Sequence, residues 1–192
     1  MAAAAPVLRP MLWYAARRGW TVDVRRFLGE EADIKERGGP NQTSPLREAT
    51  YHGHEKVVRM LLDHGADALG KDHLGLTPLF FPAQFGLLGI LLLLLENGAE
   101  VDAKNNNGMT PLCFAAYGGH EAVVMLLLEH GAAVSSKTHR VGFTPLHNAA
   151  LCGHYVVVQV LLHRGLTCSR RHSSMERLLW TSRSNTTTMR SR

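Results

Sequence analysis

Histidine and cysteine are the residue types here that commonly bind metals or act as nucleophiles, and this sequence of 192 residues has 11 histidines and 3 cysteines. Cys152 and His154 lie two residues apart, but no carboxylate or third ligand recurs beside them. A cysteine nucleophile also needs a base and a group that orients the base. No complete phosphate-loop motif ending in Gly-Lys-Ser/Thr occurs, and no Gly-x-Gly-x-x-Gly. The sequence therefore predicts no catalytic residues, no metal site, no cofactor and no enzyme activity.

An internal repeat accounts for the positions of most of these histidines. A Ser/Thr-Pro-Leu tripeptide recurs at spacings of 33, 33 and 34 residues. One glycine follows nine residues after the start of each tripeptide, and a second glycine ends the next aliphatic run. Histidines at fixed places in such a frame are expected to hydrogen-bond loop backbone. The tripeptides begin at Ser44, Thr77, Thr110 and Thr144, and the histidines are His54, His64, His120, His130, His147 and His154.

Each copy has the local chemistry of two short helices joined by a turn. Ser or Thr before Pro supplies a helix N-cap followed by a residue preset for the first helical turn. The first glycine ends an Ala-rich helix, and the second supplies the left-handed residue that stops the next helix. We expect such second helices over 121–129 and 155–164. The linking segments, such as Asn105–Gly108, have turn composition.

The segment Thr144–His154 matches Thr-Pro-Leu-His-x-Ala-Ala-x-x-Gly-His, and Thr110–His120 nearly does, with Cys113 in the histidine's place. On these residues the chain resembles the ankyrin-repeat family. The resemblance implies an all-α ankyrin-repeat solenoid of stacked helix pairs with projecting hairpin loops. It covers residues 10–165 in about five units, after an N-terminal extension over 1–9. The predicted units are 10–38, 39–71, 72–104, 105–138 and 139–165.

The third unit departs from the pattern. Pro82 stands where other units have alanine and removes a helical backbone donor, and Gly89 weakens the second helix. We therefore predict a distorted first helix and a weak point in the stack. The apolar run over 80–95 is too short and too interrupted to cross a membrane. In repeat register, outward positions of the second helices carry an apolar patch formed by Leu88, Leu92 and Met125. This patch is either local drift at a tolerant position or a second contact surface or self-association site.

The net charge of +5 belongs to the C-terminal tail, because residues 1–165 hold as many acidic as basic side chains. The neutral repeat region favours no direct sequence-specific binding of nucleic acid. The Ser/Thr/Arg-rich tail, residues 166–192, is predicted to be mostly disordered, with Ser173 a candidate phosphorylation site. The last repeat lacks a polar cap. Either residues 175–180 fold back on it, or the end self-associates, or the chain is a shortened form of a longer repeat protein.

The resemblance also indicates where partners bind, because ankyrin-like proteins use the concave groove between hairpin tips and first helices. Tyr51, Phe85 and Tyr117 are expected to form a stepped aromatic row in this groove, with arginines at its first end. Aromatic and arginine side chains are enriched in binding hot spots. The residues predicted to contact a partner are Arg17, Arg18, Tyr51, His52, Leu76, Phe85, Met109, Tyr117, Phe143 and Leu151.

We therefore expect a non-catalytic scaffold or adaptor whose partner is another protein. Two other functions remain: a substrate-recognition subunit of a ubiquitin ligase, and a nuclear transcription regulator acting through a DNA-bound partner. The few scattered cysteines and the absence of an apolar leader favour a reducing compartment, so we expect the cytoplasm, the nucleus or both.

Overall fold

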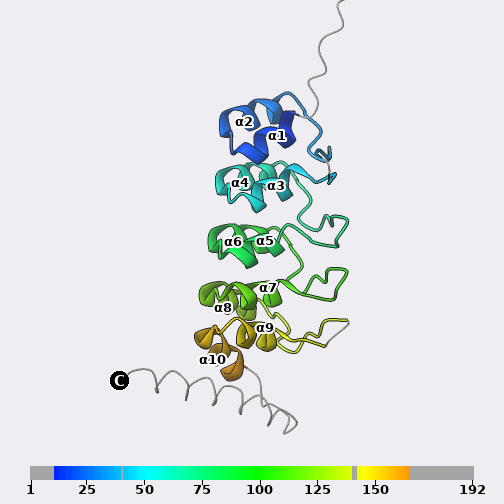
Figure 1. Cartoon of the computed structure of the whole chain (residues 1–192). Coiled ribbons are helices and arrows are strands. Elements are labelled where there is room, and N and C mark those ends of the chain that lie inside the picture. The colour runs from blue at the N-terminus through cyan, green and yellow to red at the C-terminus, as the bar shows by residue number, and fades with distance from the viewer. Residues whose placement is uncertain (1–10, 40, 140–141, 165–192) are drawn as a thin grey trace, which may run out of the picture.

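The computed structural model describes residues 11–39, 41–139 and 142–164. Helices follow one another in pairs throughout these residues, and the loops between successive pairs project to the same side (Figure 1). Gly38 and Thr43 form an isolated antiparallel bridge in the first loop. The helices are α1 (Met11–Arg18), α2 (Thr21–Gly29), α3 (Pro45–Tyr51), α4 (Glu55–Asp63), α5 (Phe80–Phe85), α6 (Leu88–Glu96), α7 (Pro111–Gly118), α8 (Glu121–Glu129), α9 (Pro145–Leu151) and α10 (Tyr155–His163).

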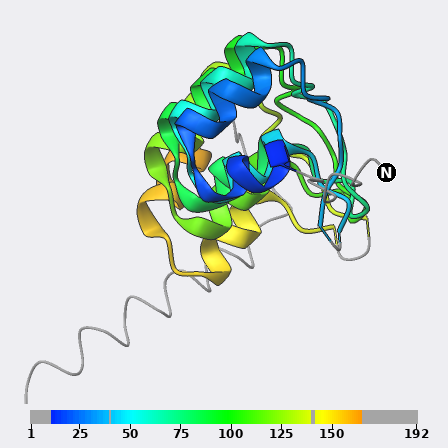
Figure 2. The same ribbon diagram turned by 90° about the horizontal axis from the view of Figure 1, so that it is seen from above.

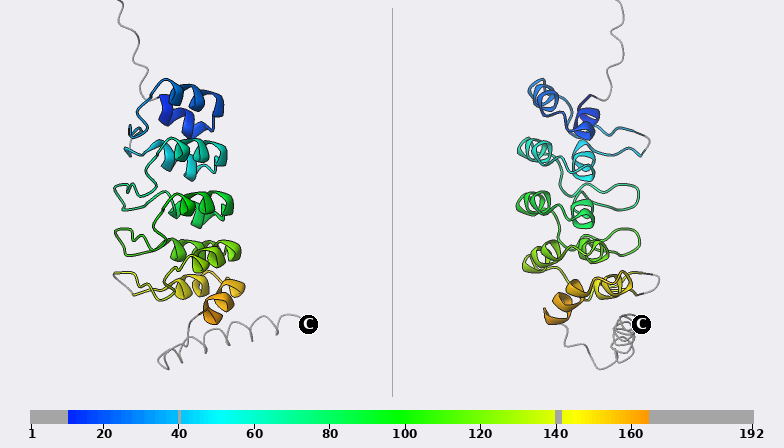
Figure 3. Two further views of the ribbon diagram at one scale, coloured as in Figure 1. Left: turned by 180° about the vertical axis from the view of Figure 1, so that it is seen from behind. Right: turned by 60° about the vertical axis from the view of Figure 1, so that its left-hand side comes forward.

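The pairs stack in chain order into an all-α solenoid, as the sequence predicts. Seen along the stack, successive units nearly superpose (Figure 2). The first helices α1, α3, α5, α7 and α9 form one column and the second helices form another (Figure 3, right). The loops extend beyond the column of first helices. This arrangement brings the same repeat position of each unit onto the same surface of the molecule.

An aliphatic core runs through the stack between the two columns. Leucines at corresponding positions of the second helices are almost fully buried, and small alanines of the first helices let neighbouring units approach. Burying such side chains is the main favourable contribution to folding. The leucines are Leu61, Leu94, Leu127 and Leu161, and the alanines are Ala15, Ala49, Ala83, Ala115 and Ala149.

The first helix of the third unit is shortened, which confirms the predicted distortion. The helices α3, α7 and α9 begin at the proline of the Ser/Thr-Pro-Leu tripeptide, whereas α5 begins two residues later, at Phe80. The Phe80 N–H donates to the Thr77 carbonyl at 3.2 Å, which closes a tighter turn instead of a helical one. Pro82 has no N–H to donate to the Pro78 carbonyl, so a helix starting at Pro78 would lack this hydrogen bond of its first turn.

Thr77 also has a hydroxyl that is buried without a hydrogen-bond partner. In the other units the capping residue finds a partner three residues later: Ser44 accepts the Arg47 N–H, and Thr144 pairs with His147. The corresponding residue in the third unit is Phe80, whose side chain has no polar atom. A buried hydroxyl without a partner destabilises the folded state.

Replacing Thr77 with valine is therefore expected to leave the free energy of unfolding unchanged or to raise it by up to about 1 kcal/mol. Valine has nearly the same shape and removes only the unpaired hydroxyl. The matched control is Thr110→Val, which deletes a hydroxyl that donates to Cys113 Sγ at 3.5 Å and is expected to destabilise the chain. Urea unfolding followed by circular dichroism measures both. A larger loss in Thr77→Val than in Thr110→Val would contradict this account.

The predicted apolar patch on the second helices is present in part. Leu88 and Leu92 of α6 are exposed, whereas Met125 of α8 is half-buried. The other leucines of α6 pack into the core. None of the helices in the described ranges is both long and apolar enough to cross a membrane.

The last described helix pair exposes apolar side chains on α10, including Tyr155, Val156 and Leu162. Self-association through this end stays a prediction. The predicted N-terminal extension, the basic tail with Ser173 and the candidate helix at 175–180 lie outside the described residues.

Candidate binding surface

The predicted contact residues of the first helices lie at the C-terminal ends of those helices, and we call this surface the inner surface. Repeat stacking places these ends in line, at the short turns that lead into the second helices, whereas the projecting loops join the N-terminal ends of α3, α5, α7 and α9 (Figure 3). Its large apolar members are well exposed: Tyr51 and Phe85 are each 44% exposed, Tyr117 is 52% exposed and Leu151 is 74% exposed. The inner surface consists of Arg17, Arg18, Tyr51, His52, Phe85, Tyr117 and Leu151.

Ring contacts hold the first part of the aromatic row in place. The Tyr51 ring meets the Phe85 ring edge to face, with centroids 5.7 Å apart, and also meets the buried Phe81 ring at 5.0 Å. Such edge-to-face pairs stabilise ring orientation beyond simple burial. Tyr51 therefore bridges two units, and its exposed side is oriented by side chains of both.

Leu76 is one of the residues predicted to contact a partner, but the structure buries it. Leu76 is only 7% exposed and packs with Phe80, Phe81 and Ala103. It lies at the base of its hairpin, because the Asp72 N–H donates to the Leu76 carbonyl and the Asp72 carboxylate accepts the Leu76 N–H. The turn residues of this hairpin are His73 and Leu74 instead.

The equivalent residues of the next two hairpins are more accessible than Leu76. Met109 is half-buried, and its N–H donates to Asn105 Oδ1 at 2.9 Å. Phe143 is exposed and stacks on the His147 ring at 5.4 Å. These residues lie near the loop bases, two residues before the N-terminal ends of α7 and α9.

Histidines fix the backbone beneath the inner surface. His54, His120 and His154 each donate from Nε2 to a carbonyl of the preceding unit, namely those of Arg17, Gln84 and Tyr117, at 2.9–3.0 Å. These histidines hydrogen-bond backbone as expected, but the acceptor carbonyls belong to the last turns of α1, α5 and α7 and not to loops. In the third unit Leu87 stands in the histidine's place, so its side chain cannot donate the equivalent hydrogen bond to the Tyr51 carbonyl.

Glycine is required where these rings pack. Gly119 has a φ of 75°, and a Cβ there would lie 2.5 Å from the His154 ring. Gly86 is in the same relation to His120. A side chain at either position would meet both the left-handed backbone and the ring. The glycines that end α5 and α7 thus also make room for the histidines that join the next units.

A buried ionic cluster lies beneath the first end of the inner surface. Arg47 donates to Asp72 from Nε and Nη2, both at 3.1 Å, and from Nη1 to Glu48 at 3.2 Å. The Arg47 guanidinium also lies over the Phe81 ring, 4.7 Å from its centroid. Thr43 accepts the Trp13 indole N–H and donates to Glu48. Sequence reasoning missed this cluster, although Arg47 departs from the family's histidine at that place in the motif.

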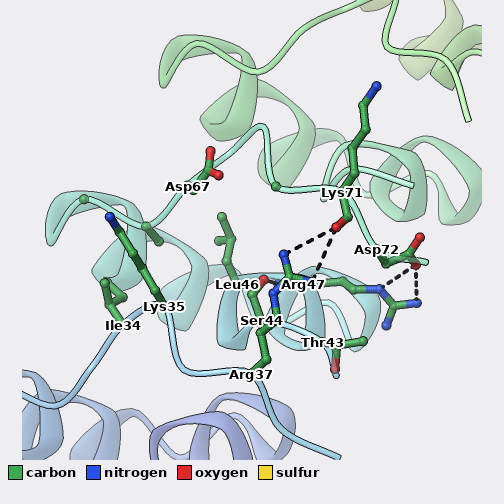
Figure 4. Close-up of a pocket in the computed structure, with 13 residues that line it drawn as sticks. Ile34, Lys35, Arg37, Thr43, Ser44, Leu46, Arg47, Asp67, Lys71 and Asp72 are labelled. Carbon is green, nitrogen blue, oxygen red and sulfur yellow. Dashed lines mark hydrogen bonds and ion pairs between the residues drawn. The ribbon is translucent and has the colours of Figure 1, made fainter. Parts of the chain in front are cut away.

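A cavity of about 450 Å³ opens beside this cluster (Figure 4). Its wall includes Gly65–Lys71, which has the spacing Gly-x-x-x-x-Gly-Lys of a phosphate loop. Asp72 follows in place of Ser or Thr, and its carboxylate is committed to Arg47. Asp67 adds a second carboxylate to the wall. The same cavity is also lined by the cations Lys35, Arg37, Arg47 and Lys71, and the segment links α4 to its hairpin.

His52 lies at the edge of the ionic cluster, with Nε2 3.7 Å from Glu48 Oε2. Burial lowers the pKa of His52 below its ordinary value of 6.5, and the neighbouring Glu48 carboxylate opposes this in part. The positive charges of Arg17, His54 and Arg18 lower the His52 pKa further. His52 is therefore neutral in the folded chain over a wider pH range than in the unfolded chain.

Because the unfolded chain binds this proton more readily, the free energy of unfolding is expected to fall as the pH drops through and below 6.5. The variant His52→Gln removes this contribution, so its stability should decline less steeply with falling pH. Urea unfolding of both proteins between about pH 7.5 and about pH 5.5 measures the difference, because all other titrating groups are shared. Equal slopes would contradict the assignment.

In the part of the chain that the structure describes, the fold does not bring the histidines and cysteines together into a candidate metal site. Cys113 is fully buried, and burial raises the pKa of its thiol. A thiol that resists ionisation is a poor nucleophile. Within the described ranges, no three His, Cys, Asp or Glu side chains come together in an arrangement that could hold a metal ion.

Comparison with known proteins gives the same family as the repeat geometry. A family model of three ankyrin repeats matches residues 12–105 and, in an overlapping second match, residues 79–172. Ankyrin repeat domain-containing protein 49 of Bos taurus is 39% identical over 57 residues, which is 30% of this chain and 24% of that protein. The alignment thus spans about a quarter of that relative. With the stacked helix pairs and the family matches together, the chain belongs to the ankyrin-repeat family.

Proposed function

We propose that this chain is a non-catalytic scaffold or adaptor whose inner surface binds a segment of a partner protein. Ankyrin repeats are in general protein-interaction modules. The observation that carries the proposal is the exposure of Tyr51, Phe85 and Tyr117 in line on successive units. Large aromatic side chains exposed together on a protein surface are typical of binding hot spots.

The inner surface is also preorganised, which favours binding. Histidine side chains hold the carbonyls of Arg17, Gln84 and Tyr117, so the backbone that carries these contact residues is fixed before a partner arrives. The Tyr51 ring is oriented by two other rings. A surface that is already ordered loses little conformational entropy on binding.

The test is affinity capture from cell lysate with the full chain and with the triple variant Tyr51→Ala/Phe85→Ala/Tyr117→Ala. We expect a partner protein to be retained by the first and lost by the second. The matched control is Val22→Ala/Leu88→Ala/Leu92→Ala, which removes exposed apolar side chains from second helices instead. Both variants must keep the helical circular dichroism of the parent chain.

The same partner on all three proteins would refute binding at the inner surface. Loss of the partner only in the control would move the contact to the outer side of the stack. The identity of a captured partner then assigns the role: a ubiquitin-ligase core component favours a substrate-recognition subunit, and a DNA-bound regulator favours a role in transcription.

A further inference from the structure

Charge is distributed unequally between the two columns of helices. In the described first helices the only carboxylate is Glu48, which is buried, and the cations are Arg17, Arg18 and Arg47. The second helices carry most of the helical carboxylates on their exposed sides. These are Asp23, Glu55, Asp63, Glu96, Glu121 and Glu129. Although the net charge of the repeat region is zero, the described first helices therefore have no exposed carboxylate.

The one carboxylate of the first helices is already committed to other groups. Glu48 accepts from Thr43 at 2.8 Å and from Arg47 at 3.2 Å, whereas Arg17 approaches it only to 4.0 Å. The Arg17 side chain is still 46% exposed. Arg18 is exposed too and lies over the Tyr14 ring, 5.3 Å from its centroid, which leaves its N–H edges facing solvent. Exposed guanidiniums of this kind bind carboxylates through paired hydrogen bonds.

The apolar residues continue from this cationic end along the stack. Tyr51, Phe85, Tyr117 and Leu151 follow in successive units. Packed helices lie about 8–10 Å apart, and an extended chain advances about 3.3 Å per residue. An extended segment that crosses the inner surface therefore places about every third residue over a new unit.

We infer that the partner segment is an acidic and apolar peptide bound in extended form across the inner surface. Its Asp or Glu side chain pairs with Arg17 and Arg18, and its aromatic or aliphatic side chains, at about three-residue spacing, contact Tyr51, Phe85 and Tyr117. This inference rests on the proposed function and adds the chemistry of the ligand. The charge complementarity gives orientation and speed of association, and the apolar contacts give most of the affinity.

The probe is a displayed library of random 12-residue peptides, selected on the full chain at low ionic strength. We expect selected peptides to be enriched in Asp or Glu about three residues from an aromatic or aliphatic residue. Synthetic copies should bind Arg17→Gln/Arg18→Gln at least about tenfold more weakly, since charge-assisted hydrogen bonds are lost. The control Arg25→Gln/Arg26→Gln removes the same charge from α2 and should change binding little.

Other outcomes separate the two proposals. Peptides that need Tyr51, Phe85 and Tyr117 but carry no acidic residue, or that ignore Arg17→Gln/Arg18→Gln, would overturn the inferred ligand and leave the proposed function standing. Failure to select any peptide that depends on the aromatic row would overturn both. Binding of a single-stranded oligonucleotide that needs Arg17 and Arg18, with no acidic peptide selected, would assign these arginines to phosphate instead.

Discussion

Replacing Asp72 with alanine is expected to lower the free energy of unfolding by about 3–5 kcal/mol, because it breaks a buried ion pair and leaves Arg47 without its main partner. The Asp72 side chain is 1% exposed and accepts two N–H groups of Arg47 at 3.1 Å. Its other oxygen accepts the backbone N–H groups of Leu74 and Leu76, at 2.8 and 2.9 Å. One carboxylate thus joins α3 to the hairpin that follows α4 and shapes that hairpin.

The next hairpin shows that an amide can make the turn bonds at this repeat position. Asn105 holds the corresponding place in the next hairpin and accepts the N–H groups of Asn107 and Met109 through Oδ1. Asp72→Asn is therefore expected to keep the turn, to lose only the ion pair, and to destabilise the chain less than Asp72→Ala. Urea unfolding of the three proteins measures both steps. Equal losses for the two variants would mean that the turn bonds contribute nothing, and a loss below about 1 kcal/mol in both would contradict the buried pair.

Replacing Phe80 with alanine is expected to lower the free energy of unfolding by about 3–5 kcal/mol through loss of burial and formation of a cavity. The Phe80 side chain is completely buried and meets the Phe114 ring edge to face at 5.1 Å, across the contact between the third and fourth units. The third unit already lacks a normal helix start and a partner for the Thr77 hydroxyl. We therefore expect this variant to expose unit three to proteolysis as well.

The matched control is Phe85→Ala, the same substitution five residues later on α5. Phe85 is 44% exposed, so the expected change in stability is within about 1 kcal/mol. Its expected effect is on partner capture, because the Phe85 ring supports Tyr51 and forms part of the inner surface. Thermal unfolding and capture assays on the two variants separate folding from binding. Similar stability losses for both would contradict the burial difference on which the proposed surface depends.

The repeat unit, its helices and the family could all be predicted from the amino-acid sequence. Each of these depends on local chemistry: a Ser or Thr cap before Pro, a glycine at a left-handed helix end, and an apolar run of helical length. The distortion at Pro82 was equally predictable, because a missing backbone donor acts within one turn. Exposure of Tyr51, Phe85 and Tyr117 followed from repeat position: Tyr51 and Tyr117 stand two residues before the glycine that ends the first helix, Phe85 stands one residue before it, and stacking places these positions on one surface.

How side chains from different units combine is visible only in the folded chain. Leu76 is buried because its side chain packs with Phe80, Phe81 and Ala103, and the local sequence pattern does not specify these contacts. Trp13, Thr43 and Asp72 meet around α3 from positions about 30 residues apart. The local pattern specifies each helix. The buried ionic cluster and the uneven surface charge depend on side chains from several units, which only the stacking of those units brings together.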